Sequence, residues 1–342
     1  MAAVYSWVAF LLLSSSQSDA FISRSIRRAH PPLVSCAVQE RNLYLHEDDE
    51  SRKICYDLVL GEKEKVNVAV LPYLYTTKNQ GISAQVEGWC RREGHTYVCA
   101  DYHGVSQSAG RGDDGTLTRW IADTIEVLEN AVPGSRTILV GAAVGAWVML
   151  RVAMQRPDLV AGLVGISCDP DFTEELLWAQ LSEEDKDAIM EKVRPSPTPN
   201  LAAELEPEHR FESLSGYLNL TSGPNSQGKH EITWGDTQYV ISKDLILDGR
   251  RNLVLQEGQN SLPIQVPVRL IHGTADEEVP LSTALRILDA VETDDAEVCI
   301  LKGMSHFMQA DGEFKALRSS LSAVVEASSN YGPFPLDCPG SG

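Results

Sequence analysis

The amino-acid sequence predicts an α/β protein built on a mainly parallel sheet that is wrapped by helices. Short runs rich in β-branched residues alternate along the chain with longer amphipathic segments, the pattern of repeated strand–helix units. Most of the short runs are apolar throughout, as expected for strands that are covered on both faces. The 342 residues leave room for one large domain of this class.

Seven strands and four helices are predicted from these patterns. The strands are expected at residues 53–60, 66–71, 96–101, 137–141, 161–167, 268–272 and 296–301. Apolar residues at steps of three and four predict helices at residues 117–128, 146–155, 282–290 and 314–327.

Residues 169–267 interrupt this rhythm and are predicted to form a helical lid inserted between two strands of the sheet. The insertion opens with an acidic segment, residues 173–193, that is expected to be one helix. It closes with residues 237–255, which are expected to be helical in their second half. An insertion of this length in a compact domain is commonly a lid over a functional site.

Composition and charge exclude several kinds of partner. The formal net charge of −19 argues against nucleic acid and anionic membrane surfaces, since both require a basic surface. No apolar run reaches the roughly 18 residues of a spanning helix, so stable membrane insertion is not expected. The seven cysteines are scattered without metal-binding spacing, which predicts buried thiols in a reducing compartment and no metal site.

The amino terminus is predicted to be a targeting sequence in two parts. Residues 1–20 contain a short apolar core followed by small residues, which is typical of a signal peptide. Residues 21–41 form the second part: residues 21–38 carry three arginines and several serines, and no acid appears before Glu40, which is typical of a transit peptide. Together they indicate import into a plastid, and a mitochondrial or secretory leader is the alternative. Residues 329–342, rich in Pro and Gly, are expected to be a flexible tail.

The stretch VGAAVGAW, residues 140–147, has the outline of a catalytic turn of the form Gly-x-nucleophile-x-Gly. It lies between a predicted strand and a predicted helix, which is the context that such a turn requires. The two glycines, Gly141 and Gly145, are expected where a side chain would strike the neighbouring strand or helix. The nucleophile position is occupied by Ala143.

An acid and a base follow the later strands in the order that accompanies this turn. Asp276 lies just after the strand predicted at residues 268–272, and His306 lies just after the strand predicted at residues 296–301. Loops that follow parallel strands meet at the carboxyl edge of the sheet, so both side chains are expected near Ala143. The chain order nucleophile, acid, base is that of the α/β-hydrolases.

Longer stretches make the family resemblance specific. The sequence DYHGVSQS, then VGAAVGAWVML, DFTEELLWAQLS, DLILDGRRNLVL, HGTADEEVP and GMSHF resembles one branch of the α/β-hydrolase fold. That branch includes a mitochondrial palmitoyl-protein thioesterase and its bacterial relatives. The resemblance implies an α/β-hydrolase domain at about residues 42–328 that acts on a small acyl ester or thioester without metal or cofactor. It also implies an oxyanion hole formed by the backbone N–H groups of Val144 and Leu74, and it leaves any protein partner unidentified.

Two departures from the family pattern fall where the chemistry would occur. The family turn reads Gly-Ser-Ser-x-Gly-Gly, whereas this chain carries Ala142, Ala143 and Ala146 at three of those positions. In the loop after residues 66–71, Tyr73 occupies the place of a family glycine. The second change bears on the loop that normally supplies one oxyanion N–H.

The sequence therefore predicts a catalytically impaired or ligand-binding pseudohydrolase. The alternative is an active ester or thioester hydrolase in which His306 and Asp276 activate a water molecule directly. A substitute nucleophile is the remaining option. The candidates are Ser106 and Ser108, which lie in the loop after the strand predicted at residues 96–101, and Cys168, which lies at the end of the strand predicted at residues 161–167.

Overall fold

The computed structural model describes residues 39–111, 114–190, 218–220, 230–234, 237–256 and 261–329. The expected signal-like segment, nearly all of the transit-like segment and the expected tail from residue 330 lie outside these residues. The first described element is the strand β1 (Gln39–Leu45), whose residues 39–41 had been expected to end the transit-like segment. This strand was not predicted because its sequence is largely polar. Polar side chains are tolerated there because β1 is an exposed strand at the edge of the sheet.

Eight strands form one sheet in the order β1-β2-β4-β3-β5-β6-β10-β11. β1 and β2 pair antiparallel with each other, β2 pairs antiparallel with β4, and the remaining pairs are parallel. The strands after β1 are β2 (Ile54–Val59), β3 (Asn67–Leu71), β4 (Thr96–Ala100), β5 (Thr137–Ala142), β6 (Val160–Ile166), β10 (Val268–Gly273) and β11 (Ala296–Leu301). All seven predicted strands are therefore confirmed, and so is the mainly parallel sheet.

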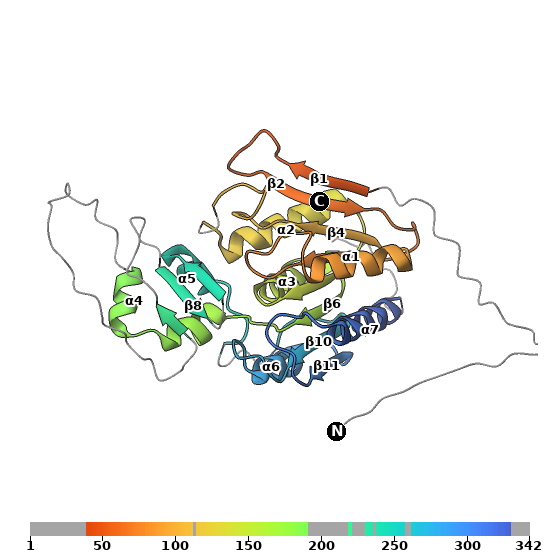
Figure 1. The fold of residues 1–342 in the computed structure, drawn as a ribbon. Helices are drawn as coiled ribbons and strands as arrows, with labels where there is room; N and C mark the ends of the chain where they lie inside the picture. The colour runs from red at the N-terminus through yellow and green to blue at the C-terminus, as the bar shows by residue number, and fades with distance from the viewer. Residues whose placement is uncertain are drawn as a thin grey trace, which may run out of the picture. The chain divides into compact units, whose positions relative to one another are not determined.

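Helices cover both faces of this sheet (Figure 1). α1 (Ile82–Glu93) and α7 (Asp311–Ser328) pack on one face, and α2 (Leu117–Ala131), α3 (Val144–Gln155) and α6 (Leu281–Ala290) pack on the other. Four of these helices were predicted. α1 was not, although its buried Ile82, Val86, Trp89 and Cys90 have helical spacing, because polar residues and Gly88 separate these few apolar positions.

The segment between β6 and β10 differs from its prediction. Residues 173–193 do not form one helix: a π-helical turn (Thr173–Leu177) and a short 3₁₀ turn (Trp178–Gln180) come before α4 (Glu183–Met190). The chain is extended at Leu181, and the Ser182 hydroxyl then accepts a hydrogen bond of 3.1 Å from the Asp185 N–H. A serine that caps a helix start in this way favours a new helix over continuation of the old one.

The same segment contains strands that were not predicted. β7 (Leu218–Leu220), β8 (His230–Trp234) and β9 (Thr237–Ile241) form a small antiparallel sheet, followed by α5 (Lys243–Gly249). The helical second half expected for residues 237–255 is thus present as α5, but the insertion is not wholly helical.

Two further sequence expectations can be compared with the described residues. Within them, no helix combines the length and apolar character needed to cross a membrane. Among the described cysteines, Cys55, Cys90, Cys99 and Cys168 are buried free thiols and Cys299 is half-buried.

Candidate functional site

Ala143 lies at the sharp turn between β5 and α3, in a conformation that is unusual for alanine. Its φ is 49° and its ψ is −120°, in the left-handed half of the map where non-glycine residues carry strain of about 1–3 kcal/mol. The Ala143 N–H donates a 3.0 Å hydrogen bond to the carbonyl oxygen of Ile166, which holds the turn against the end of β6. The turn thus keeps the backbone of a nucleophile elbow with a methyl group at its apex.

The two glycines of the turn are there for steric reasons. A Cβ on Gly141 would lie 2.6 Å from the Cα of Ala146 in α3, and a Cβ on Gly145 would lie 2.1 Å from the carbonyl oxygen of Leu71 at the end of β3. Both contacts are with backbone atoms, which cannot move aside cheaply. The helix can approach the sheet this closely because these two positions lack side chains.

Asp276 and His306 meet at the carboxyl edge of the sheet. Asp276 follows β10 and His306 follows β11, and the Nδ1 atom of His306 lies 3.2 Å from Oδ2 and 3.3 Å from Oδ1 of Asp276. The carboxylate also accepts backbone hydrogen bonds from Glu278 at 3.0 Å and Val279 at 2.9 Å. The structure therefore brings the predicted acid and base within hydrogen-bonding distance of each other, and both side chains are buried.

The pair shifts the pKa of each partner in the direction that favours charge. Burial works to lower the pKa of His306, but the hydrogen bond to Asp276 and the negative charges of Glu278, Asp276 and Asp169 outweigh it and raise this pKa. Burial works to raise the pKa of Asp276, but the His306 hydrogen bond and charge outweigh it and lower this pKa. The geometry thus favours an imidazolium–carboxylate pair.

Tyr73 braces the loop that carries the histidine. Its buried hydroxyl donates a 3.2 Å hydrogen bond to the carbonyl oxygen of His306 and accepts one of 3.3 Å from the Met308 N–H. Its ring packs against Phe307 with centroids 4.9 Å apart. Burial raises the pKa of Tyr73, so the phenol stays protonated and able to donate. The residue that departs from the family pattern is therefore built into the support of His306.

The two backbone N–H groups expected to form an oxyanion hole border the same space. Val144 is the first residue of α3, so its N–H has no acceptor within the helix. Leu74 lies in a turn closed by a 3.1 Å hydrogen bond from the Thr76 N–H to the Tyr73 carbonyl oxygen. Both residues line the cavity described next.

One cavity brings most of these groups together. It spans about 410 Å³, part of which is open to solvent, and its walls come from the loops at the carboxyl edge of the sheet and from β9. The lining residues are Tyr73, Leu74, Ala143, Val144, Asp169, Phe172, Ile241, Glu278, His306 and Phe307. The Ala143 turn and His306, the predicted base, thus face a common space, and Asp276 lies behind the histidine.

Two carboxylic acids in this cavity were missed by the sequence interpretation. Asp169 follows β6 and is only 8% exposed, and its Oδ1 atom makes no hydrogen bond within the described part of the chain. The Oε2 atom of Glu278 lies 3.8 Å from Nε2 of His306, on the ring edge opposite Asp276. The signal that could have found Asp169 is its place directly after a buried strand, the same rule that located Asp276 and His306.

The substitute nucleophiles considered from the sequence do not line this cavity. Ser106 is exposed, and the Ser108 hydroxyl is buried between the Asp101 carbonyl oxygen (2.7 Å) and the Cys55 N–H (3.0 Å). Cys168 is buried, and burial raises the pKa of its thiol, which disfavours the reactive thiolate.

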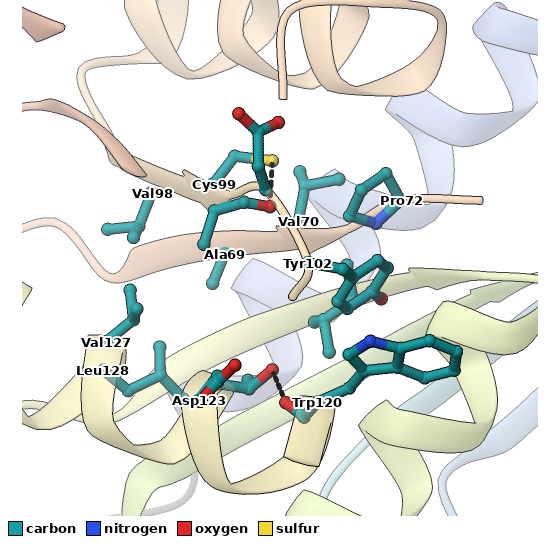
Figure 2. A pocket seen from close by; sticks show the side chains of 14 residues that line it. Ala69, Val70, Pro72, Val98, Cys99, Tyr102, Trp120, Asp123, Val127 and Leu128 are labelled. Carbon is teal, nitrogen blue, oxygen red and sulfur yellow. Dashed lines mark hydrogen bonds between the residues drawn. The ribbon is translucent and has the colours of Figure 1, made fainter. Parts of the chain in front are cut away.

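A second cavity lies apart from this site, between α2 and the strands β3 and β4. Figure 2 shows Ala69 and Val98 on its sheet side and Asp123, Val127 and Leu128 on its α2 side. Among the described residues, none lines both this cavity and the first one. Among the residues that the structure describes, no group of three or more histidine, cysteine, aspartate or glutamate side chains is arranged to hold a metal ion.

The fold and this arrangement at the sheet edge define an α/β-hydrolase type of protein, and comparison with known families agrees. The family model described as alpha/beta hydrolase fold matches residues 89–313, so the chain belongs to this family. The resemblance inferred from the sequence is thereby confirmed at the level of the family.

The individual relatives are only distantly similar to this chain in sequence. The chain is 24% identical over 308 residues to the mitochondrial palmitoyl-protein thioesterase ABHD10 of Pongo abelii, covering 90% of this chain and 88% of that protein. The corresponding Mus musculus protein is 24% identical over 314 residues, covering 91% and 93%.

Solved structures show the same fold. Alpha/beta hydrolase domain-containing protein 10 from mouse superposes with a TM-score of 0.63 at 23% identity, covering 83% of this chain and 98% of that one. Est1E from Butyrivibrio proteoclasticus with bound ferulic acid gives a TM-score of 0.57 at 14% identity, covering 84% and 99%. At these identities the likeness concerns the fold alone.

Proposed function

We propose that the chain is a ligand-binding member of the α/β hydrolase fold family that does not hydrolyse esters by the serine mechanism. The observation that carries this proposal is Ala143, whose methyl group stands at the apex of the strained turn beside His306. Without a hydroxyl there is no alkoxide to attack a carbonyl and no acyl-enzyme to form. In a well-studied protease, loss of the nucleophile alone lowers kcat by about 10⁶-fold.

The proposed ligand is a small acyl ester or thioester. The cavity offers apolar and aromatic walls from Phe172, Ile241 and Phe307 to an acyl or aryl body. The Val144 N–H at the start of α3 can donate a hydrogen bond to a carbonyl oxygen, since replacing serine by alanine leaves this backbone group in place. The names of the relatives, which are palmitoyl-protein thioesterases, support the same ligand class.

Thermal unfolding in the presence of esters and thioesters of graded chain length tests this proposal, with product formation followed in parallel. A binder that does not turn over is expected to gain stability as ligand concentration rises, while product stays at background. The variant Ala143→Leu, whose side chain would fill the cavity, should fold and lose the ligand effect. Stabilisation by none of these compounds, or hydrolysis by the unmodified protein, would contradict the proposal.

The alternative is hydrolysis by water that His306 activates with the help of Asp276. The contact of 3.2 Å between the two side chains beside the cavity favours it, because such a pair is the base of the serine mechanism. The raised pKa of His306 confines such turnover to higher pH, because only the neutral imidazole can accept a proton from water. Turnover by the unmodified protein that disappears in His306→Ala would support this alternative.

The proposed location is an organelle. The mitochondrial names of the relatives and the Arg-bearing, acid-poor residues 21–38 support import, and the signal-like residues 1–20 favour a plastid. Fusion of residues 1–40 to a fluorescent reporter should direct it to the plastid. Delivery to mitochondria or secretion would show that the plastid assignment is wrong.

A further inference from the structure

One residue in the loop that borders the candidate cavity is held twice by a single carboxylate. The Lys78 N–H donates a 2.8 Å hydrogen bond to Oδ1 of Asp101, and the Nζ atom of Lys78 donates one of 2.9 Å to Oδ2 of the same side chain. The exposed fractions of the two side chains are 2% and 0%. Both oxygens of one buried carboxylate thus fix the backbone and the ammonium group of Lys78.

Asp101 is in turn tied to the sheet. It directly follows β4, its N–H donates a 2.9 Å hydrogen bond to the Cys55 carbonyl oxygen in β2, and its carbonyl oxygen accepts one of 2.7 Å from the Ser108 hydroxyl. Burial works to lower the pKa of Lys78, but the hydrogen bond and the charge of Asp101 outweigh it and raise this pKa, so the ammonium group stays charged. The Lys78–Asp101 pair is therefore an ion pair anchored at the carboxyl end of β4.

Stability alone is a weak reason for such a pair. Removing two charges from water costs free energy, and a buried ion pair can often be replaced by well-packed apolar residues with little loss of stability. What the pair supplies is geometry, because two charge-supported hydrogen bonds from one carboxylate fix the place of the backbone at Lys78. That backbone belongs to the connection between β3 and α1, which also carries Leu74.

The segment between Leu74 and Lys78 contains a strained residue. The φ of Tyr75 is 62°, in the left-handed region that a non-glycine residue adopts at a cost. Such a conformation persists only where the surrounding structure over-determines it. Here Tyr73 is bonded on one side to the loop after β11, and Lys78 is bonded on the other side to Asp101. The chain that presents the Leu74 N–H is thus fixed at both ends.

From this arrangement we propose that Lys78 and Asp101 are positioning residues, which hold the loop so that the Leu74 N–H can donate to the carbonyl oxygen of a bound ester or thioester. Neither residue lines the candidate cavity, so both act through the backbone of the loop. The inference rests on the proposed binding function and deepens it, because selection for a carbonyl group then depends on an ion pair outside the cavity.

Calorimetric titration with two matched probes tests the inference. Methyl 3-phenylpropanoate carries the carbonyl group, and 3-phenylpropyl methyl ether lacks only the carbonyl oxygen. The unmodified protein should bind the ester about tenfold more tightly than the ether, as expected for hydrogen bonds to a neutral carbonyl. In an NMR titration, the Leu74 amide proton should shift more with the ester than with the ether.

The double variant Lys78→Met, Asp101→Leu replaces the ion pair with apolar side chains, so that neither charge stays buried without the other. Its preference for the ester should fall to about threefold or less, while its affinity for the ether stays unchanged. A general weakening of the fold would lower both affinities. The milder double variant Lys78→Met, Asp101→Asn keeps an oxygen that can accept the N–H of position 78, and its preference should lie between these two values.

Arg269→Met is the control. Arg269 is also a largely buried cation, 8% exposed and paired with Asp295 at 2.7 Å, but it is the second residue of β10 and lies away from the carboxyl edge of the sheet. Its loss should leave the ester preference as in the unmodified protein.

The outcomes separate this inference from the proposed function. A full ester preference in either double variant, or equal binding of ester and ether by the unmodified protein, overturns the inference and leaves the binding function standing. Failure of both double variants to fold also contradicts the inference, because the pair would then be required for folding itself. Binding of neither probe by the unmodified protein overturns both. Hydrolysis of the ester contradicts the proposed function, and the same comparison of affinities made in His306→Ala then decides the inference.

Discussion

The hydroxyl of Tyr73 donates a hydrogen bond to the carbonyl oxygen of His306 across 233 positions of sequence. It thereby links the loop after β3, which carries Leu74, to the loop after β11, which carries the histidine. The sequence showed Tyr73 only as a departure from the family pattern in the oxyanion loop. In the structure, the same residue connects the two loops that border the cavity.

Tyr73→Phe is expected to destabilise the fold by about 1–3 kcal/mol, because it leaves the His306 carbonyl oxygen and the Met308 N–H without their buried partner. Thermal unfolding measures this loss of stability. In an NMR spectrum of the variant, the ring resonances of His306 should shift. Tyr97→Phe is the control, since it removes a similar 3.2 Å hydrogen bond to the Lys78 carbonyl oxygen away from the cavity. If the His306 resonances in Tyr73→Phe did not shift, Tyr73 would not position the histidine.

Gly145→Ala should lower the free energy of unfolding by about 3 kcal/mol or more, since the new Cβ would meet the Leu71 carbonyl oxygen at 2.1 Å. Gly312→Ala in α7 is the matched control: its Cβ would meet nothing within 4 Å, so stability should rise by about 0.5–1 kcal/mol. Chemical denaturation compares the two. Equal effects would mean that α3 does not approach β3 as described.

The His306–Asp276 pair should give a defined pH dependence. The raised pKa of His306 contributes stability that is present below the unfolded value of about 6.5 and is lost as pH rises through the folded pKa. The lowered pKa of Asp276 contributes stability that is present above the unfolded value of about 3.9 and is lost as pH falls through the folded pKa. Asp276→Asn should therefore destabilise the protein most between about pH 4 and 6.5.

An NMR titration checks the same pair directly. The pKa of His306 should fall in Asp276→Asn, because its hydrogen-bonded counter-charge is gone. His95, whose ring bonds to the Val66 carbonyl oxygen on the other side of the domain core, should titrate as before. An unchanged His306 pKa would mean that the contact with Asp276 does not persist in solution.

The fold was largely predictable because the buried parallel strands leave unbroken apolar runs, such as those of β5 and β10. β1 was missed because its sequence, QERNLYL, is that of an exposed edge strand. The helix predicted at residues 173–193 was too long because helical spacing continues across Leu181 and Ser182, and only the capping hydrogen bond of Ser182 reveals the break.

For the candidate site, sequence order and strand ends were enough to place Ala143, Asp276 and His306 at one edge of the sheet. The carboxyls of Asp169 and Glu278 were not recognised, because their meaning depends on burial and on the distant neighbours that the fold brings to them. Neither property can be read from DPDF or DEEV in the sequence. The role of Tyr73 was hidden for the same reason, since its partner His306 is remote in sequence.

Restoring the missing hydroxyl tests the central claim most directly. Alanine and serine differ by one heavy atom, so Ala143→Ser should fit the existing turn and place its oxygen in the cavity that His306 lines. A fluorophosphonate probe, which reacts only with an activated serine, should leave the unmodified protein unlabelled and label Ala143→Ser. Labelling should fall sharply in the double variant Ala143→Ser, His306→Ala. Labelling of the unmodified protein that depends on His306, or a folded Ala143→Ser that stays unlabelled, would contradict the account of an intact site lacking only its nucleophile.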